Sequence, residues 1–317
     1  MFDLKITGGT VVDGTGADRF RADIGIKDGV IVDVVRRGAN DPEMGGLEMA
    51  DAAETIDATG HVVAPGFVDI HTHYDGQVSW DALLEPSSGH GVTTVVTGNC
   101  GVGFAPVRPG REQWLIELME GVEDIPGTAL TEGITWDWET YPEYLNAIGK
   151  QKFAIDVGSQ IAHGAVRAYA MGERGARNEP ATPDDIAAMG RLVTEAIEAG
   201  ALGFSTSRTM GHRAMDGEPV PGTFAAEEEL FGLGRAMAAG GQAVFELAPQ
   251  RARTSSPPRR NWSGCGDWVA KSTDRCRSLS SRWTPIRTSG ASSWTSPRMH
   301  TRRAAGCTPR SRRVRSA

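Results

Sequence analysis

The sequence predicts an α/β protein in which residues 62–250 form a parallel sheet or barrel. Apolar strand-like segments alternate with helical ones along this part of the chain, as expected when helices connect parallel strands. Residues 1–61 contain strand-like segments only, and residues 251–317 follow neither a helical nor a strand period. We therefore divide the chain into three parts, with boundaries near residues 61 and 250.

The first part, residues 1–61, reads as short strands joined by turns. Strands are expected at Leu4–Ile6, Thr10–Val12, Ala22–Lys27 and Val30–Val35. Turns are expected at Gly8-Gly9, Asp13-Gly14 and Asp28-Gly29. The segment from Asn40 to Ala53, which contains Pro42 and Gly45-Gly46, is expected to be a loop.

The second part is expected to hold five strands and the helices that connect them. The strands fit best at residues 62–70, 91–98, 153–162, 201–206 and 242–247. Two helices fit clearly, at Pro183–Ala199 after a Thr182 cap and at Ala225–Ala239 after Thr223. A complete eightfold barrel takes about 250 residues. Residues 62–250 are therefore expected to form an incomplete barrel.

Residues 104–150 separate the second and third predicted strands by an unusually long segment. We expect an insertion with a helix over the mouth of the barrel. Its aromatic residues include Trp114, Trp136, Trp138 and Tyr141. Aromatic side chains bury large areas and commonly pack, so packing is favoured here over contact with a substrate.

Composition limits the classes of function that the chain can have. The whole chain has a net charge of −7, but residues 251–317 hold fifteen Arg and one Lys against two Asp. The first 250 residues are therefore strongly acidic, which argues against nucleic-acid binding there. They contain a single Cys, which excludes a disulfide framework and fits the cytoplasm. No membrane helix or secretory signal is expected, and nothing in the sequence sets an oligomeric state.

A pair of histidines marks the end of the first barrel strand. Residues 62–73 read Val-Val-Ala-Pro-Gly-Phe-Val-Asp-Ile-His-Thr-His. Side chains alternate along a strand, so His71 and His73 point in the same direction. Two imidazoles side by side at the end of a strand are suited to bind a metal ion. The preceding Pro65-Gly66 and Asp69 make this motif more specific than a bare His-x-His.

With this motif the chain resembles the amidohydrolase superfamily, metal-dependent hydrolases whose first barrel strand carries His-x-His. Residues 91–103, GVTTVVTGNCGVG, are similar to the D-aminoacylase branch, the N-acyl-D-amino-acid deacylases. A cysteine at the end of strand 2 is a metal ligand in that branch, so the resemblance implies this role for Cys100. Thiolate is a good zinc ligand, and Zn²⁺ is the implied cofactor. The alternative is that Cys100 is a small buried apolar residue.

The resemblance implies an incomplete (β/α)8 TIM-type barrel beside a small β-sandwich, to which residues 1–61 contribute. It implies hydrolysis of the amide bond of a small N-acyl-D-amino acid. Zinc would lower the pKa of a bound water, and a carboxylate would pass its proton to the leaving amine. The alternatives are a cyclic-amide hydrolase of the dihydropyrimidinase or dihydroorotase type, and a non-catalytic fragment or basic-tailed interaction protein. The Gly98-Asn99-Cys100-Gly101 segment favours the deacylase.

Other polar residues follow the predicted strands, where barrel enzymes place their chemistry. His163 follows the third strand and either binds the substrate or is structural. Arg208 follows the fourth strand, where its guanidinium either clamps a carboxylate or forms a surface ion pair. His212, close behind it, is a further candidate for substrate binding. His61 and His90 precede their strands and are expected to be structural.

The chain departs from the family in the fifth strand. D-aminoacylases have a metal-binding His there, whereas residues 244–249 read Val-Phe-Glu-Leu-Ala-Pro. Glu246 is a candidate oxygen ligand in its place, and a changed metal set or a changed substrate are the alternatives. The family's strand-6 His and its catalytic strand-8 Asp are expected beyond residue 250, where this sequence lacks both motifs. The catalytic residue is therefore not identified, and this chain is expected to be impaired.

Residues 251–317 are expected to be irregular and to arise from a frameshift. They hold three of the four Cys and four of the eight Trp of the chain, and no Glu. Trp and Cys codons begin with TG, so reading one base earlier converts them to Leu, Met or Val codons. In that frame, with permissive third bases, residues 259 onward regain a helix–strand–helix–strand pattern. A basic nucleic-acid arm and simple disorder are the alternatives.

Overall fold

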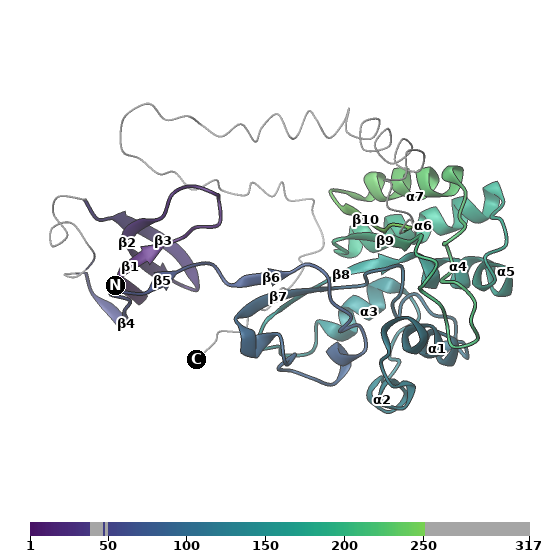
Figure 1. The fold of residues 1–317 in the computed structure, drawn as a ribbon, viewed down its shortest axis with the longest axis horizontal. Coiled ribbons are helices and arrows are strands. Elements are labelled where there is room, and N and C mark those ends of the chain that lie inside the picture. Colours follow the sequence, from purple (N-terminus) through teal and green to yellow (C-terminus); the bar gives the residue numbers. More distant parts are fainter. Residues whose placement is uncertain (39–46, 48–49, 251–317) are drawn as a thin grey trace, which may run out of the picture.

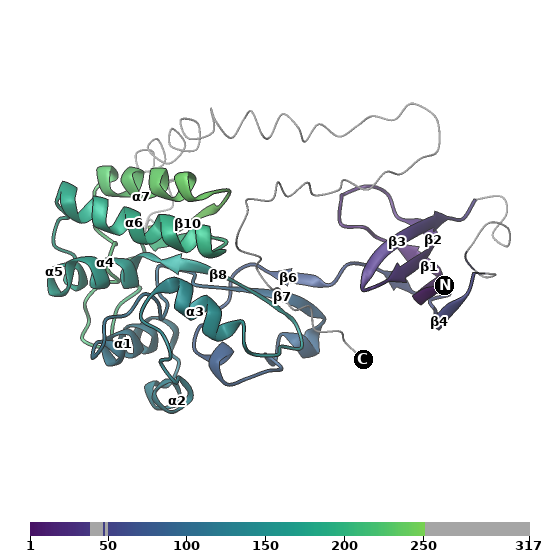
Figure 2. The same ribbon diagram turned by 180° about the vertical axis from the view of Figure 1, so that it is seen from behind.

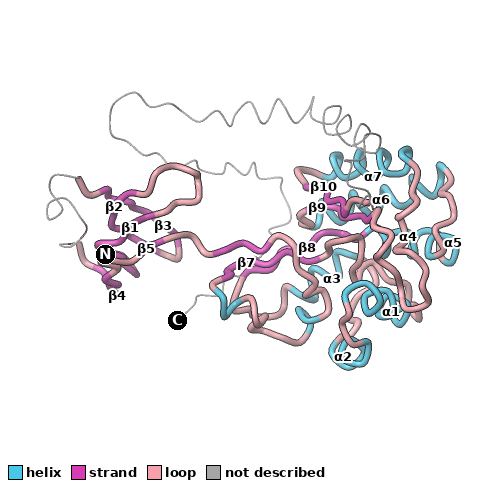
Figure 3. Tube along the Cα trace, viewed as in Figure 1, coloured by secondary structure: helices cyan, strands magenta, loops and turns pink. Residues whose placement is uncertain are grey.

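The computed structural model describes residues 1–38, 47 and 50–250. Two five-stranded sheets follow one another along the chain and are joined near residues 63–67 (Figure 1). Among the described residues, helices accompany the second sheet and not the first (Figure 3). None of the helices described is both long enough and apolar enough to cross a bilayer. The mixed α/β architecture is the one that the sequence predicts.

The first sheet consists of β1 (Phe2–Val11), β2 (Phe20–Lys27), β3 (Val30–Arg36), β4 (Ala52–Asp57) and β5 (Val62–Val63). Its strand order is β3-β2-β1-β4, and β5 pairs with the end of β1. Val11, Ala22 and Ile24 form a small core. The buried carboxylate of Asp23 accepts hydrogen bonds from the Arg37 guanidinium at 2.8 Å and 2.9 Å, which neutralises its charge inside this sheet.

Two predictions for the first sheet are wrong. The turn expected at Gly8-Gly9 is absent, because β1 runs through it as one strand; Gly8 has φ +72° and the register against β2 shifts between Ile6 and Gly9. A glycine at positive φ occurs in β-bulges as well as in turns, so the sequence alone could not distinguish a bulge from a turn here. The strand β4 is not among the predicted strands and begins inside the expected loop, most of which lies outside the described residues.

The turn expected at Asp28-Gly29 is confirmed. The two residues have φ values of 51° and 71° and join β2 to β3. Both central residues of a type I′ hairpin turn have positive φ, and Asp-Gly is a preferred sequence for it. The hairpin therefore forms where the sequence predicts it.

The second sheet is parallel throughout and contains β6 (Phe67–Asp69), β7 (Val92–Thr97), β8 (Asp156–Ala162), β9 (Gly203–Ser207) and β10 (Val244–Ala248). Each strand pairs with the next one along the chain, so that the order in the sheet is β10-β9-β8-β7-β6. This is the strand order of a (β/α) barrel. Within the described residues, β6 and β10 each have one neighbour only, so the barrel is open there.

The strand predicted at residues 62–70 is divided between the two sheets. Val62 and Val63 pair with β1, whereas Phe67–Asp69 pair with β7. Pro65 lies between these pieces and has no N–H to donate to a strand ladder. At Gly66 a Cβ would overlap the side chain of Thr93, so glycine allows the close approach to β7. One apolar segment thus passes from the first sheet into the second.

The helices of the second part are α1 (Glu112–Glu123), α2 (Gly127–Gly133), α3 (Tyr141–Ile148), α4 (His163–Met171), α5 (Glu173–Ala176), α6 (Pro183–Ala199) and α7 (Glu227–Gly240). Short 3-10 turns lie at Gln77–Ser79 and Ser88–His90. The helices α6 and α7 pack side by side (Figure 2). Ile161 and Phe204 of the sheet belong to the same buried core as Val193 and Leu233 of these helices.

The helix α6 has the predicted bounds, and its first turn is capped as expected. Thr182 Oγ1 accepts a hydrogen bond from the Asp185 N–H at 3.2 Å, and the Asp185 carboxylate accepts one from the Thr182 N–H at 2.9 Å. The predicted Thr223 cap of α7 is wrong. The helix begins after Ala226 without a side-chain cap, and Thr223 Oγ1 instead donates to the carbonyl of Val220 at 2.7 Å.

The insertion at residues 104–150 contains three helices, where the sequence predicted one. Trp138 and Tyr141 are buried, and Trp138 Nε1 donates a hydrogen bond to the Phe104 carbonyl at 2.9 Å. Trp136 meets the Phe104 ring edge to face and the Trp138 ring at a tilt, with ring centroids 5.6 Å apart in each pair. These aromatic residues therefore pack with one another, as favoured from the sequence.

Candidate metal centre

The chain places two histidines and a cysteine beyond the carboxyl ends of neighbouring strands. The strand β6 ends at Asp69, shortly before His71 and His73, and β7 ends at Thr97, shortly before Cys100. Because these strands are parallel, both segments leave the sheet at the same edge. This is the edge at which the sequence predicts the chemistry of the barrel.

The Gly98-Asn99-Cys100-Gly101 segment turns sharply at this edge. Gly98, Cys100 and Gly101 have φ values of 77°, 56° and 74°. At Gly98 a Cβ would overlap the carbonyl oxygen of Gln160, so that position admits only glycine. The buried Asn99 amide donates to the Thr72 carbonyl at 3.0 Å and thereby ties this turn to the histidine segment. The motif residues around Cys100 thus hold the two segments together.

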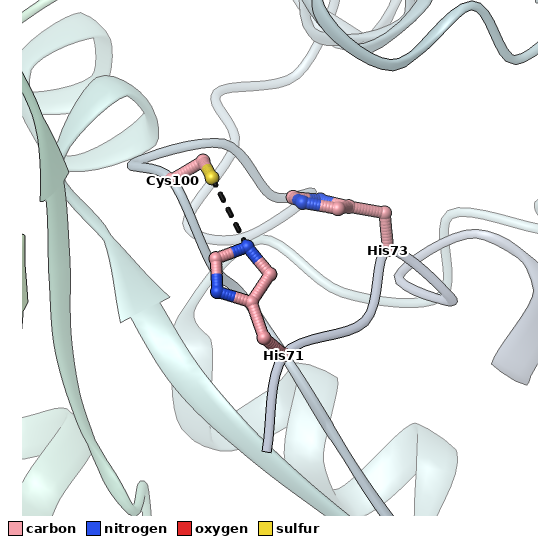
Figure 4. Close-up of side chains that lie close together, drawn as sticks. All are labelled: His71, His73 and Cys100. Atoms are coloured by element: carbon pink, nitrogen blue, oxygen red, sulfur yellow. Dashed lines mark hydrogen bonds between the residues drawn. The ribbon is translucent and has the colours of Figure 1, made fainter. Parts of the chain in front are cut away.

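His71, His73 and Cys100 converge on one point. Each offers a ligand atom, and these three atoms lie within 4.8 Å of one another. His71 Nε2 lies 3.2 Å from Cys100 Sγ (Figure 4). His71 is exposed, His73 is half-buried and Cys100 is buried, so the cluster opens to solvent on the His71 side.

His73 is in a form suited to bind a metal. Its burial, and then the nearby imidazoles of His71 and His212, lower its pKa to about 4, so the ring is neutral at pH 7. Nε2 lies 3.2 Å from Glu123 Oε1, and Nδ1 is buried with no hydrogen-bond partner among the described residues. A neutral imidazole has a lone pair for a cation.

Cys100 is a buried thiol that is protonated in the absence of a cation. Burial, followed by the nearby carboxylates of Glu246, Glu123 and Asp75, raises the pKa of the Cys100 thiol to about 12. A bound cation reverses this balance, because metal coordination deprotonates a thiol. The site therefore couples metal binding to the loss of a proton from Sγ.

Two carboxylates lie beside Cys100, one predicted from the sequence and one not. Glu246, on β10, accepts a hydrogen bond from the Cys100 backbone N–H at 3.2 Å, and burial raises its pKa. Asp75, which the sequence did not single out, accepts one from the Gly98 N–H at 2.7 Å through Oδ1. Its other oxygen is buried without a partner in the described part of the chain, and burial raises the Asp75 pKa to about 7.

Glu123 is a third carboxylate at the site that the sequence did not predict. It is the last residue of α1, and its side chain is 19% exposed beside His73. Burial and the charge of Asp124 raise its pKa to about 7. One signal was present in the sequence: Glu123 and Asp124 are adjacent acids at a helix C-terminus, where the helix dipole disfavours negative charge.

His212 lies near the same cluster, on the loop that follows β9. Its Nδ1 is 3.1 Å from Ser207 Oγ. Burial, and then the neighbouring His71, lower the pKa of His212, which places its imidazole within electrostatic reach of the cluster. Of the three residues predicted to bind substrate, His212 is the one that the structure brings to this region.

His163 and Arg208 are engaged in hydrogen bonds elsewhere in the fold. His163 is fully buried, with Nδ1 2.8 Å from Thr206 Oγ1 and Nε2 2.9 Å from Glu229 Oε1. Arg208 donates to the carbonyls of Thr223 and Ala225, at 3.3 Å and 2.6 Å. The polar groups of both side chains are thus engaged within the protein. This favours the structural alternative for His163, and it favours a role for Arg208 in holding the loop at residues 223–225.

The buried Asp75 carboxylate is expected to make the stability of the metal-free protein depend on pH. Burial raises its folded pKa to about 7, above the ordinary value of 3.8. The native state therefore holds this proton more tightly than the unfolded state and loses stability as pH rises from about 4 to 7. Asp75→Asn removes this titration. The stability of the variant relative to the parent should increase with pH, by at most about 1.4 kcal/mol per pH unit.

Urea unfolding in the presence of a chelator, at several pH values from 4 to 8, measures this difference. The exposed Asp137 supplies a control, since Asp137→Asn should show no such trend. A pH-independent difference between parent and Asp75→Asn would contradict the prediction.

Comparison with known proteins gives a consistent set of relatives. Residues 54–269 match a family described as the amidohydrolase family. A D-aminoacylase from Alcaligenes xylosoxydans xylosoxydans is 35% identical over 205 residues, which cover 65% of this chain and 37% of that protein. An N-acyl-D-glutamate deacylase from the same organism is 35% identical over 240 residues, covering 75% of this chain and 42% of the relative.

Solved structures show the same resemblance. A crystal structure of D-aminoacylase, described as defining a novel subset of amidohydrolases, has a TM-score of 0.62 at 28% identity and covers 87% of this chain and 50% of its own. The N-acyl-D-glutamate deacylase of Bordetella bronchiseptica, complexed with zinc and a phosphonate inhibitor, has a TM-score of 0.57 at 29% identity. It covers 88% of this chain and 56% of its own. The chain thus spans about half the length of these relatives or less.

Proposed function

Because this chain belongs to the amidohydrolase family, we propose that it is a zinc-dependent hydrolase of N-acyl-D-amino acids, impaired by the sequence that follows residue 250. The observation that carries this proposal is the convergence of His71, His73 and Cys100 beyond the carboxyl ends of two adjacent parallel strands. The relatives named D-aminoacylase and N-acyl-D-glutamate deacylase support the substrate class. We propose further that residues 67–250 are the partial barrel and that residues 1–63 belong to the small β-sandwich, since Val62 and Val63 pair with β1.

The residues present fit a zinc ion. Two imidazoles and a thiol are the donors that zinc prefers, and a separation of 3.2 Å between His71 Nε2 and Cys100 Sγ suits two ligands of one ion. Burial and the carboxylates of Glu246, Glu123 and Asp75 disfavour a thiolate at Cys100, and a zinc ion would supply the positive charge that favours it. A relative of known structure is a zinc complex. We therefore assign His71, His73 and Cys100 as ligands, with Glu246 as a further candidate.

When bound, zinc lowers the pKa of a coordinated water and polarises a carbonyl group. The protein's own part is to hold three donors rigidly at the strand ends, which the Asn99 link between the two segments achieves. Cys100 would give up its proton to hold the ion as a thiolate, and the neighbouring Glu246 carboxylate accepts the backbone N–H of that residue. His212, oriented by Ser207, is proposed to face the substrate.

We also propose that residues 251–317 result from a frameshift. The composition changes at residue 250 from acidic to basic, with fifteen Arg and one Lys against two Asp in the last part. Partial coverage of the relatives supports a parent that is longer than the matching part of this chain. The predicted irregularity of these residues lies outside the described residues. Sequencing the gene across codons 245 to 260 tests this directly.

Metal analysis and deacylation assays test the function. The chain with its original frame restored after residue 250 should bind zinc and release the acid from N-acetyl-D-amino acids faster than from their L enantiomers. The cyclic-amide alternative predicts activity on dihydrouracil or dihydroorotate instead. Zinc-free protein, or protein that hydrolyses only a cyclic amide, would refute the proposal.

Glu246 provides a milder test of the same site. Glu246→Gln keeps an oxygen that can accept the Cys100 N–H but removes the negative charge beside the thiol. Loss of a partner beyond the ligands typically costs about 10 to 100-fold in metal affinity or activity. We expect a decrease of that size in zinc affinity, measured by competition with a chelator, and a filled site at saturating zinc. Glu228→Gln, on the exposed side of α7, is the control and should leave the affinity unchanged.

A further inference from the structure

One carboxylate beside the predicted ligands has no role in the proposal above. Glu123 comes from α1, in the insertion between β7 and β8, and its side chain meets His73 on the metal-facing edge of the sheet. The His73 and Glu123 side chains are 16% and 19% exposed, so this contact is largely removed from solvent. The insertion thus brings a half-buried acid to the metal centre.

The position of Glu123 is unfavourable for a carboxylate unless a cation lies nearby. It is the last residue of α1, and the helix ends at Asp124, which has φ 54° and donates its N–H to the Glu120 carbonyl. The negative end of the helix dipole and the neighbouring Asp124 both oppose a negative charge at this place. No Lys or Arg side chain pairs with Glu123 in the described part of the chain. The cost of placing a carboxylate here calls for a compensating positive charge.

The distance between Glu123 and His73 suits two ligands of one ion. His73 Nε2 and Glu123 Oε1 are 3.2 Å apart, which is also the separation of His71 Nε2 and Cys100 Sγ. The same distance lies at the upper limit of N–H···O hydrogen bonds, about 2.7–3.2 Å, so the test must separate a shared ion from a simple hydrogen bond. Two ligands of a tetrahedral zinc ion, at bond lengths of about 2.0–2.3 Å, lie about 3.3–3.8 Å from each other, slightly farther apart than these metal-free pairs.

We propose that Glu123 is a further ligand of the metal centre and that its Oε1 binds the ion on the His73 side of the site. The inference rests on the proposed zinc site and deepens it. It gives the insertion at residues 104–150 a function, because the end of α1 completes a donor set that the two strands begin. The centre then contains two imidazoles, a thiolate and a carboxylate, so that two negative ligands balance a divalent ion.

The test compares Glu123→Gln with Glu117→Gln in the full 317-residue chain. Glu117 lies on the same helix and is exposed. Glu117→Gln therefore makes the same change of charge on the same helix, away from the site. After metal removal, zinc affinity is measured by competition with a chromophoric chelator. We expect Glu123→Gln to bind zinc at least about tenfold more weakly than the parent. Glu117→Gln should bind like the parent.

Cobalt substitution separates a ligand from a residue that only orients His73. At saturating Co²⁺, Glu123→Gln should keep the thiolate-to-cobalt charge-transfer band of Cys100 but change the d–d bands, since these report the ligand set. Unaltered d–d bands would mean that Glu123 acts only as a hydrogen-bond acceptor for His73, and would overturn the inference. Parent-like zinc affinity would overturn it as well.

The unfolding temperature of the metal-free proteins shows whether Glu123 has a purely structural role. Glu123→Gln should unfold at the same temperature as the parent or above it, because the substitution removes a charge that the helix end disfavours. A lower temperature would show that Glu123 supports the fold, and would count against the inference. If the parent itself bound no zinc, the proposed function would fail, whereas a failure confined to Glu123→Gln leaves that function intact.

Discussion

Replacing Cys100 with serine is expected to abolish both tight zinc binding and deacylase turnover. The substitution exchanges a thiolate for a neutral hydroxyl, which removes a strong zinc ligand and a negative charge from the centre of the cluster. His71 Nε2, 3.2 Å from Sγ, would lose its neighbouring donor. Elemental analysis of zinc, together with the rate on N-acetyl-D-amino acids in the frame-restored protein, measures both effects.

A matched control distinguishes this effect from general loss of a cysteine. Cys265 belongs to the part of the chain outside the described residues, and Cys265→Ser in the 317-residue chain should leave zinc affinity unchanged. The Cys100→Ser protein should also keep the far-ultraviolet circular dichroism of the parent, because serine is of similar size. Full zinc content with near-normal rates in Cys100→Ser would overturn the assigned site and favour the cyclic-amide alternative.

Restoring the reading frame near codon 250 is expected to convert an inactive protein into an active one. The family places a further metal-binding His and its catalytic Asp beyond the fifth strand, and residues 251–317 lack both motifs. A gene with one base inserted or deleted near this codon should encode the missing strands. We expect measurable hydrolysis of N-acetyl-D-amino acids from that protein and none from the 317-residue chain.

The comparison requires that both proteins be assayed at equal zinc content and equal folded fraction. A second gene, with synonymous changes near codon 250 and no shift, serves as the control for expression. Equal activity of the two forms would show that residues after 250 are dispensable for catalysis. The frameshift explanation and the assignment of the catalytic carboxylate to that region would then both be wrong.

The sequence was a good guide to the barrel strands because each is a separate apolar segment with its own boundaries. The strands near residues 153–162, 201–206 and 242–247 appear as β8, β9 and β10, and α6 appears with its predicted cap. The strand expected at residues 62–70 was harder to predict, because its division between two sheets depends on tertiary contacts that the local sequence does not show. The same holds for Gly8-Gly9, where local sequence admits either a bulge or a turn.

The candidate site was predictable only where its residues lie within short motifs. His71 and His73 follow the same strand, and Cys100 lies in a glycine-rich turn, so both motifs can be recognised from the sequence alone. Glu123 reaches the site from the end of a helix in the insertion, and its approach to His73 depends on how that helix packs. His163 shows the reverse case. It follows a strand as a catalytic residue would, but Thr206 and Glu229 surround it in the core.

The open edges of the second sheet bear on the fate of the protein in the cell. Within the described residues, β6 and β10 each have a hydrogen-bonded neighbour on one side only, and Phe67, Val68 and Val244 on them are more than half exposed. A strand edge without a neighbouring strand is prone to associate with other chains, and exposed apolar side chains add to this tendency. We therefore expect chaperone capture and proteolysis to lower the abundance of this polypeptide.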